Sequence, residues 1–208
     1  MPEVASSLSV RFAPLAPPGS PRAAPFDDTA QRGPPAAWIA RIDAADYRLC
    51  RRLNRGAAHP LVRRVFQIAS RLGDGLIWYG LLAVLPLLYG RRALAPEVAM
   101  ACTGVLGVIL YKLLKRTFVR ERPFITHAAI DLGMPPLDRY SFPSGHTLHA
   151  VAFALQASMH FPPLGYVLVP LALLICGSRV VLGLHYPTDV LAGAALGALL
   201  GALGLLLS

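Results

Sequence analysis

The sequence predicts an all-α protein: a transmembrane helical bundle of about five spans with amphipathic helices at the membrane interface. Hydrophobic residues make up 55% of the 208 residues, and the mean hydropathy is +0.52. Both values are high for a soluble domain and typical of a protein that crosses a membrane several times. In addition, long apolar runs alternate with short basic clusters. Because a spanning helix satisfies its own backbone hydrogen bonds, such runs predict helices and no sheet.

The amino-terminal third of the chain carries no uninterrupted apolar run. Residues 1–35 are rich in Pro, Ala and Ser without a sustained period, and we interpret them as a disordered tail. Residues 38–53 and 61–72 mix apolar side chains with several arginines. Each arginine at a bilayer centre costs about 2.5–3.5 kcal/mol on insertion scales, so neither stretch is expected to span. We predict interfacial helices within residues 36–73, although ordinary surface helices would show the same pattern.

Five apolar runs then form a predicted transmembrane domain over residues 74–208. They cover residues 75–90, 98–114, 147–161, 164–177 and 190–207. Arg91 and Arg92 close the first run, and Pro162-Pro163 forces a turn after the third. The fifth run contains Gly197-x-x-x-Gly201, a pattern that allows close helix contact but is common in apolar helices.

A polar stretch between the fourth and fifth runs contains Arg179, His185 and Asp189. His185 and Asp189 are four residues apart, a spacing that can place the carboxylate beside the imidazole. A carboxylate in that position fixes the tautomer and leaves the other ring nitrogen as a nucleophile or base. The planar cation of Arg179 suits a phosphate. The alternative is a histidine that only packs and an arginine that snorkels.

Two more polar clusters border the apolar runs. Lys115 and Arg122-Pro123 follow the second run, and Pro143-Ser144-Gly145-His146 precedes the third. Because successive spans alternate in direction, we expect both clusters and the stretch 178–189 on the same face of the membrane. Three separated segments of the chain would then form one site.

The cations of this site suit an anionic ligand. Lys115, Arg122 and Arg179 would bring three positive charges to one pocket, where arginine forks add directional bonds to phosphate oxygens. Taken alone, Lys115 and Arg122 could simply be positive-inside residues.

The segment before the third run adds donors and an acid. Backbone N–H groups at Ser144 and Gly145 would point at an anion from the start of a helix, and Ser144 adds a hydroxyl. His146 could donate a proton to a leaving oxygen. Taken alone, these residues could be only a helix cap and turn.

Together the motifs resemble the three-part signature of the type 2 phosphatidic acid phosphatase family, within the lipid phosphate phosphatase and vanadium haloperoxidase superfamily. The matching positions are Lys115-x6-Arg122-Pro123, Pro143-Ser144-Gly145-His146 and Ser178-Arg179-x5-His185-x3-Asp189. The resemblance implies that His185 attacks phosphorus and forms a phosphohistidine, that Asp189 orients it, and that His146 protonates the leaving alkoxide and then activates water. It also implies that no metal or cofactor is needed. The implied phosphate-binding residues are Lys115, Arg122, Ser144, Gly145 and Arg179.

The membrane setting favours a lipid substrate whose tail stays in the bilayer. Candidates are phosphatidic acid, phosphatidylglycerol phosphate and prenyl phosphates or diphosphates, among which the motifs do not choose. A lipid phosphotransferase, a catalytically inactive lipid-phosphate-binding membrane protein and vanadate-dependent halide oxidation are the alternatives. The net charge of +9 does not indicate nucleic-acid binding, because the basic residues lie in short clusters between apolar runs. The sequence leaves the oligomeric state open.

We expect a multi-pass protein of the bacterial inner membrane. With five spans, the amino terminus lies on the catalytic side, which then holds most of the Lys and Arg residues. Positive-inside counting therefore favours a site that faces the cytoplasm. The three cysteines, Cys50, Cys102 and Cys176, predict neither a disulfide framework nor a zinc site.

Overall fold

The computed structural model describes residues 37–208, in which every regular element is helical apart from one β-bridge between Glu121 and Tyr140. The all-α class is therefore confirmed for this part, while the predicted tail at residues 1–35 lies outside the described residues. The elements are α1 (Ala37–Asn54), η2 (Arg55–Ala58), α2 (Pro60–Leu72), α3 (Leu76–Tyr89), η3 (Gly90–Ala93), α4 (Leu94–Thr117), α5 (Pro123–Thr126), α6 (Gly145–His160), α7 (Pro162–Val181) and α8 (Pro187–Leu205).

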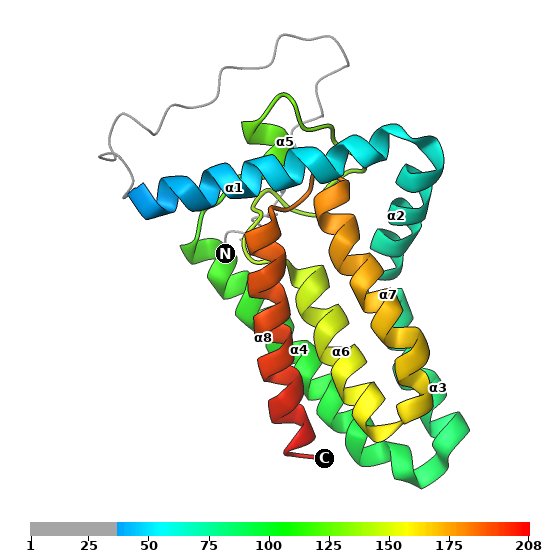
Figure 1. Cartoon of the computed structure of the whole chain (residues 1–208). Helices are drawn as coiled ribbons and strands as arrows, with labels where there is room; N and C mark the ends of the chain where they lie inside the picture. The colour runs from blue at the N-terminus through cyan, green and yellow to red at the C-terminus, as the bar shows by residue number, and fades with distance from the viewer. Residues whose placement is uncertain (1–36) are drawn as a thin grey trace, which may run out of the picture. The chain divides into compact units, whose positions relative to one another are not determined.

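Helix α6 is the central element of a bundle that it forms with α3, α4, α7 and α8 (Figure 1). It packs mainly on α8 and α7 and also contacts α4, while α2 packs on α7. Helix α1 lies across the ends of α7 and α8 and contacts both (Figure 1). The loops and helix ends beneath α1 are those that carry the predicted site.

Three segments are long and apolar enough to cross a membrane: Leu76–Thr117, Pro162–Val181 and Pro187–Leu205. The first contains two helices, α3 and α4, which η3 joins at the end of the bundle opposite α1 (Figure 1). Helix α6, with 16 residues, is not among the three. The expected count of about five spans is not confirmed and stays a prediction.

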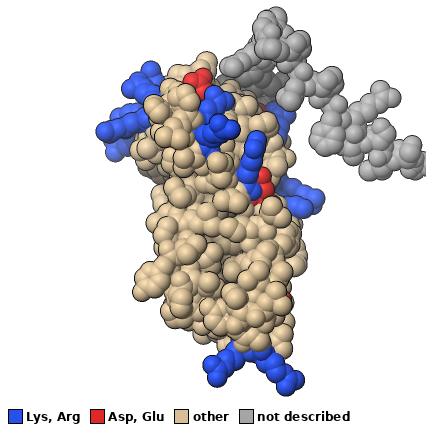
Figure 2. Space-filling view, turned by 90° about the vertical axis from the view of Figure 1, so that its right-hand side faces the viewer, with Lys and Arg blue, Asp and Glu red and all other residues tan. Residues whose placement is uncertain are grey.

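The surface has the charge distribution of a membrane protein. Figure 2 shows Lys and Arg gathered at the two ends of one face, with an almost uncharged band between them. Large apolar side chains are exposed along the bundle helices, among them Leu76, Leu87, Leu106, Tyr166, Val167, Leu173, Leu191 and Leu199. An apolar belt between two basic ends is typical of a protein embedded in a bilayer.

Both amphipathic stretches form helices where the sequence predicts them, as α1 and α2. Trp38 on α1 and Leu61 on α2 are exposed, as membrane-facing or solvent-facing residues would be. Each helix also buries polar groups, Asp46 on α1 and Ser70 on α2. These buried groups contact the predicted site, whereas the location of the two helices at the interface stays a prediction.

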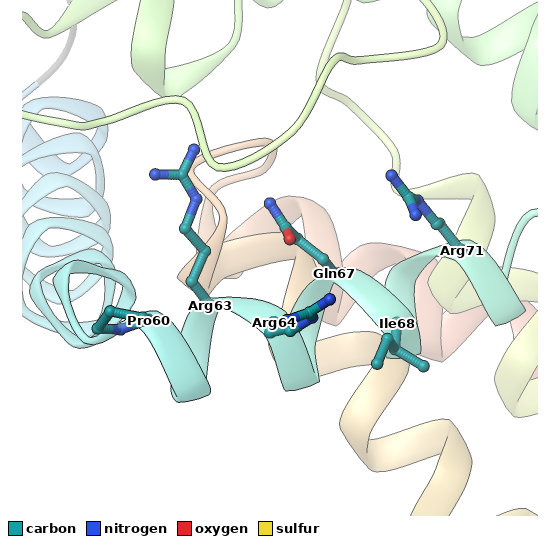
Figure 3. A pocket seen from close by; sticks show the side chains of 6 residues that line it. All are labelled: Pro60, Arg63, Arg64, Gln67, Ile68 and Arg71. Atoms are coloured by element: carbon teal, nitrogen blue, oxygen red, sulfur yellow. The ribbon is translucent and has the colours of Figure 1, made fainter.

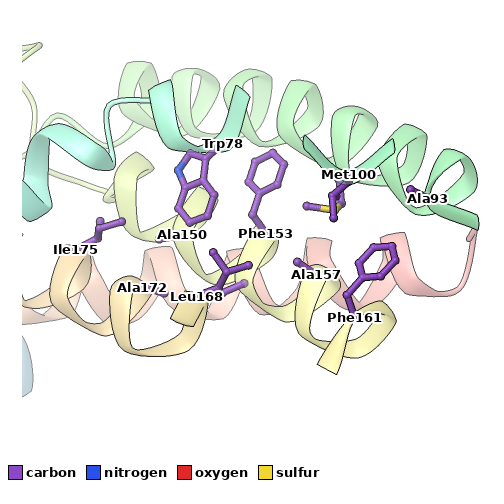
Figure 4. Close-up of a cluster of buried hydrophobic side chains, with 12 residues drawn as sticks. Trp78, Ala93, Met100, Ala150, Phe153, Ala157, Phe161, Leu168, Ala172 and Ile175 are labelled. Carbon is purple, nitrogen blue, oxygen red and sulfur yellow. The ribbon is translucent and has the colours of Figure 1, made fainter. Parts of the chain in front are cut away.

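A hydrophobic core joins α3, α4, α6 and α7 (Figure 4). Trp78 stacks on Phe153 with ring centroids 5.4 Å apart, and Met100 and Leu168 are buried in the same cluster. This packing fixes the helices along the bundle while the polar side chains gather near α1.

Glycines allow α8 to lie very close to α6. A Cβ at Gly193 would lie 2.5 Å from the carbonyl oxygen of Ser144, and a Cβ at Gly197 would clash with the carbonyl oxygen of Leu148. The backbone N–H of Ser144 donates to the carbonyl oxygen of Asp189 at 3.1 Å. Close packing of the two helices thus holds the starts of α6 and α8 together.

We expect Gly197→Ala to destabilise the protein although alanine is the better helix former. Overpacking of this kind costs about 1–3 kcal/mol, which exceeds the gain of about 0.5–1 kcal/mol in helix propensity. Gly80→Ala in α3 is the matched control, because a Cβ there meets no atom within 4 Å in the described part of the chain, apart from the backbone of its own helix. Thermal unfolding in detergent should give a lower midpoint for Gly197→Ala and an equal or higher one for Gly80→Ala.

Candidate active site

The polar segments predicted to converge lie together at the α1 end of the bundle. The Nη1 atom of Arg122 lies 3.2 Å from Nε2 of His185, which joins the first motif directly to the third. The hydrogen bond from Ser144 N–H to the Asp189 carbonyl oxygen joins the second motif to the third. His185 N–H donates to the carbonyl oxygen of Arg179 at 2.9 Å, so the third motif is folded back on itself.

The surroundings of His185 favour the neutral tautomer that carries its proton on Nδ1. It is 1% exposed, and its Nε2 faces Arg122. A guanidinium only donates hydrogen bonds, so Nε2 accepts and the ring proton belongs on Nδ1. Nδ1 lies 3.8 Å from Oδ2 of Asp189, which is adjacent but beyond hydrogen-bonding distance. Burial, followed by the charges of Arg122 and other cations, holds the pKa of His185 well below its usual value, so the ring stays neutral.

Asp189 is anchored by two bonds at the start of α8. Its Oδ2 accepts the N–H of Tyr186 at 2.8 Å, and its Oδ1 lies 2.7 Å from Nη1 of Arg120. Arg120 also forms an ion pair with buried Asp46 at 2.8 Å, which ties α1 to the site. The sequence analysis did not identify Arg120; its signal was a second arginine two positions before Arg122.

The carboxylate of Asp138 forms ion pairs with both cations of the first motif. Lys115 Nζ lies 2.7 Å from each oxygen of the Asp138 carboxylate, and Arg122 Nη2 lies 2.7 Å from one of them. Arg122 also donates to the carbonyl oxygens of Asp138 and Leu184. Although burial raises the pKa of Asp138, hydrogen bonds and charges from Lys115 and Arg122 bring it below its usual value. The Asp138 side chain is 43% exposed, so this ion cluster faces an opening.

Arg179 is buried in the last turn of α7 and is 2% exposed. Its Nη1 donates to the hydroxyl oxygen of Ser70 on α2. Its Nε has no hydrogen-bond partner among residues 37–208, nor does Nδ1 of His185. Unpaired buried donors are rare. The one on Arg179 fits a pocket that accepts an anion, whereas the one on Nδ1 of His185 lies beside the Asp189 carboxylate.

His146 lies in the first turn of α6 and contacts the end of α2. Its Nε2 is 2.5 Å from a carboxylate oxygen of Asp74. Gly73 fits closely against the ring, because a Cβ there would lie 3.1 Å from Cδ2 of His146. Together with Ser70, these residues make the carboxyl end of α2 one wall of the site. The sequence analysis missed this wall, although the polar turn Gly73-Asp74-Gly75 between two helices was a signal.

Ser144 and Gly145 form the tight start of α6. Ser144 is the N-cap residue, and its hydroxyl oxygen accepts the N–H of Thr147 at 3.4 Å. Gly145 packs on Tyr111, since a Cβ there would lie 3.3 Å from the ring. The N–H of Ser144 already donates to the carbonyl oxygen of Asp189, so of the two backbone donors expected from the sequence only that of Gly145 can serve an anion.

Comparison with known proteins assigns the chain to a family. The sequence profile described as the PAP2 superfamily matches residues 96–208, which is more than half of the chain. The chain belongs to the PAP2 superfamily.

Relatives of this PAP2 protein are lipid phosphatases. The chain is 31% identical over 127 residues to undecaprenyl-diphosphatase BcrC of Bacillus subtilis, covering 61% of this chain and 65% of that protein. It is 35% identical over 135 residues to decaprenylphosphoryl-5-phosphoribose phosphatase of Mycobacterium tuberculosis, covering 64% of this chain and 73% of that protein. The crystal structure of a transmembrane PAP2 type phosphatidylglycerolphosphate phosphatase from Bacillus subtilis superimposes with a TM-score of 0.63 and 26% identity, covering 79% of this chain and 84% of that one.

The described part of this PAP2 protein contains no cluster of three His, Cys, Asp or Glu side chains that could hold a metal ion. The predicted independence from metals stays a prediction, which an assay with a chelator tests. Cys50, Cys102 and Cys176 are free thiols.

We expect Asp138→Asn to strengthen inhibition by inorganic phosphate. The carboxylate competes with phosphate for Lys115 and Arg122, and removing one partly screened charge near an anion should lower the inhibition constant about three- to tenfold. Asp131→Asn is the matched control, because Asp131 is exposed on the same loop and its side chain forms no ion pair with any residue from 37 to 208. Equal inhibition constants for Asp138→Asn and wild type would contradict the expected competition.

Proposed function

We propose that this PAP2 protein is an integral-membrane lipid phosphatase that cleaves a phosphomonoester or diphosphate through a phosphohistidine at His185. The contact between Arg122 Nη1 and His185 Nε2 carries the proposal, because it directs the lone pair of a neutral imidazole toward a cluster of cations. The names of the relatives support a lipid phosphate as the substrate: a prenyl diphosphate, a prenylphosphoryl phosphoribose and phosphatidylglycerol phosphate.

In the first step, Nε2 of His185 attacks phosphorus, and the bond from phosphorus to the leaving oxygen breaks. Burial lowers the pKa of His146 to about 4, and the negative phosphate bound beside it raises this pKa, so His146 takes up a proton with the substrate. His146 then gives this proton to the leaving oxygen, and the lipid product leaves. The imidazole becomes positively charged when it carries the phosphoryl group. Asp189, adjacent to Nδ1, compensates that charge and keeps the ring oriented.

In the second step, water attacks the phosphohistidine and loses a proton to His146. The phosphorus–nitrogen bond breaks, its electron pair returns to Nε2 of His185, and inorganic phosphate is released. Asp74 bonds His146 and orients it for both proton transfers. In both steps Lys115, Arg122 and Arg179, with the hydroxyl of Ser144 and the backbone N–H of Gly145, would stabilise negative charge on the phosphoryl oxygens.

The arrangement of the chain supports a substrate that is held in the bilayer. The proposed site lies at one end of an apolar bundle, where a phosphate head group can enter while its tail stays among lipids (Figure 1). The segment 36–73 is expected to lie at the interface. Its Asp46 and Ser70 reach the proposed site, as does Asp74 directly after it, so the segment contributes to the catalytic scaffold of residues 74–208.

Phosphate release from purified protein tests the proposal. The full chain in detergent with EDTA should release phosphate from at least one of phosphatidic acid, phosphatidylglycerol phosphate and a prenyl diphosphate. His185→Ala should release none, whereas His160→Ala should match wild type, because His160 contacts Ser208 at the far end of the bundle. Transfer of label to an added lipid alcohol would identify a phosphotransferase. Binding without release would identify an inactive lipid-phosphate-binding protein.

A reporter fused after Ser208 tests the proposed location in the inner membrane and the proposed cytoplasmic orientation of the site. Helix α8 begins in the site and ends at the opposite end of the bundle (Figure 1). A site that faces the cytoplasm therefore predicts a periplasmic reporter, and a cytoplasmic reporter would reverse the orientation.

A further inference from the structure

A basic groove runs along α2 toward the site and takes no part in the proposed reaction. It has a volume of about 520 Å³ and is lined by Pro60, Arg63, Arg64, Gln67, Ile68 and Arg71. Figure 3 shows Arg63, Gln67 and Arg71 extending from one side of the helix toward the loop above it. Their spacing of four residues places them on one face of α2.

Two of these side chains build the wall of the groove. Gln67 Nε2 donates to the carbonyl oxygen of Gly133 at 2.7 Å, and Arg63 donates to the carbonyl oxygens of Gly133 and Leu132. These bonds fix the loop over α2. Arg64 and Arg71 make no hydrogen bond or ion pair with any residue of the described part of the chain. The groove is therefore strongly positive, and two of its three guanidinium groups are available to a ligand.

The groove ends beside the proposed catalytic pocket. Arg71 directly follows Ser70, whose hydroxyl bonds buried Arg179, and Asp74 three residues later contacts His146. Consecutive Cα atoms are about 3.8 Å apart, so the backbone of Arg71 lies next to that of Ser70, which contacts Arg179 directly. An anion at Arg71 and the phosphate that is cleaved would therefore both be bound next to the carboxyl end of α2.

We propose that this groove binds a second phosphate group of the lipid substrate. The inference rests on the proposed function and narrows its substrate class to lipids whose head group carries two phosphates. The cleaved phosphate occupies the cluster around His185, and the second binds Arg71 and Arg64, whose planar forks suit phosphate oxygens. A lipid with one phosphate leaves the groove unused. The groove thereby distinguishes phosphatidylglycerol phosphate or a prenyl diphosphate from phosphatidic acid.

The test compares phosphatidylglycerol phosphate with phosphatidic acid of the same acyl chains, in neutral detergent micelles. Wild type should have the higher kcat/KM for the lipid with two phosphates. Arg71→Gln and Arg64→Gln should each lower that value about tenfold, the scale of one lost hydrogen bond to a charged group, and should leave phosphatidic acid hydrolysis unchanged. Arg92→Gln, in the connection between α3 and α4, is the matched control and should change neither.

Other outcomes separate the two proposals. If the two arginine variants lost kcat/KM equally on both lipids, the proposed second-phosphate site would be overturned. A loss that appears only in phosphatidylcholine vesicles containing anionic phosphatidylglycerol would overturn it as well, since the groove would then bind the membrane surface. Unchanged kinetics in both variants would also overturn it while leaving the phosphatase intact. Failure of wild type to release phosphate from any lipid of the panel would instead overturn the proposed function. Matching thermal midpoints of the variants and wild type would establish that each variant is folded.

Discussion

Brief exposure of the protein to a prenyl diphosphate labelled in its terminal phosphate should leave the label on His185. Phosphohistidine survives alkali and hydrolyses in acid, so an alkaline quench followed by peptide mapping locates it. His185→Asn should carry no label, because the amide cannot form the bond. His146→Gln should accumulate label, since a phosphate leaving group depends little on protonation while the attack of water loses its base.

Two results would contradict this mechanism. Acid-stable label in wild type would indicate a different nucleophile, such as a serine. Phosphate release from His185→Asn at the wild-type rate would indicate direct attack by water. His160→Gln should behave as wild type in both measurements, because His160 lies at the far end of the bundle from His185.

Arg122→Gln should lower kcat/KM about 10²–10³-fold, the usual effect of removing one donor that stabilises a transition state. Arg122 is 1% exposed and joins three parts of the site, since it contacts Nε2 of His185, the carbonyl oxygen of Leu184 and the carboxylate of Asp138. Arg122→Lys should not restore activity, because an ammonium group cannot reach all three partners at once. Initial rates over a range of substrate concentrations give the comparison.

Arg139→Gln is the control for this prediction. Arg139 lies on the same loop, its side chain is 68% exposed and it pairs with Glu121 at 2.7 Å. Exposed pairs contribute about 0–1 kcal/mol, so activity should stay within a few-fold of wild type. An Arg122→Gln enzyme that loses no more activity than Arg139→Gln would contradict the assigned importance of Arg122.

The order of motifs along the chain was sufficient to predict that three polar segments meet. That prediction needed only apolar runs that alternate in direction, and the contacts of Arg122 and Ser144 with the third motif agree with it. The number of spans was harder to predict, because apolar length alone does not separate a spanning helix from a short core helix such as α6.

The partners of the motif residues could not be predicted. Asp74 and Ser70 lie 72 and 109 residues from the side chains that they contact. Local spacing carries no information about such pairs. Asp46 was also misleading, because a charge on an amphipathic helix is normally solvated, whereas here it is buried against Arg120. Tertiary packing decides which charges of such a helix face inward.

Helices α1 and α2 supply contacts that the three motifs do not contain, so the motifs alone cannot reproduce the site in another protein. The family profile begins at residue 96, but Asp46, Ser70 and Asp74 precede it. A fragment limited to residues 96–208 would keep every motif residue. Arg120, Arg179 and His146 would each lose one side chain that they contact, because Asp46, Ser70 and Asp74 would be missing. Modular reuse of the three motifs in another scaffold therefore requires the two preceding helices as well.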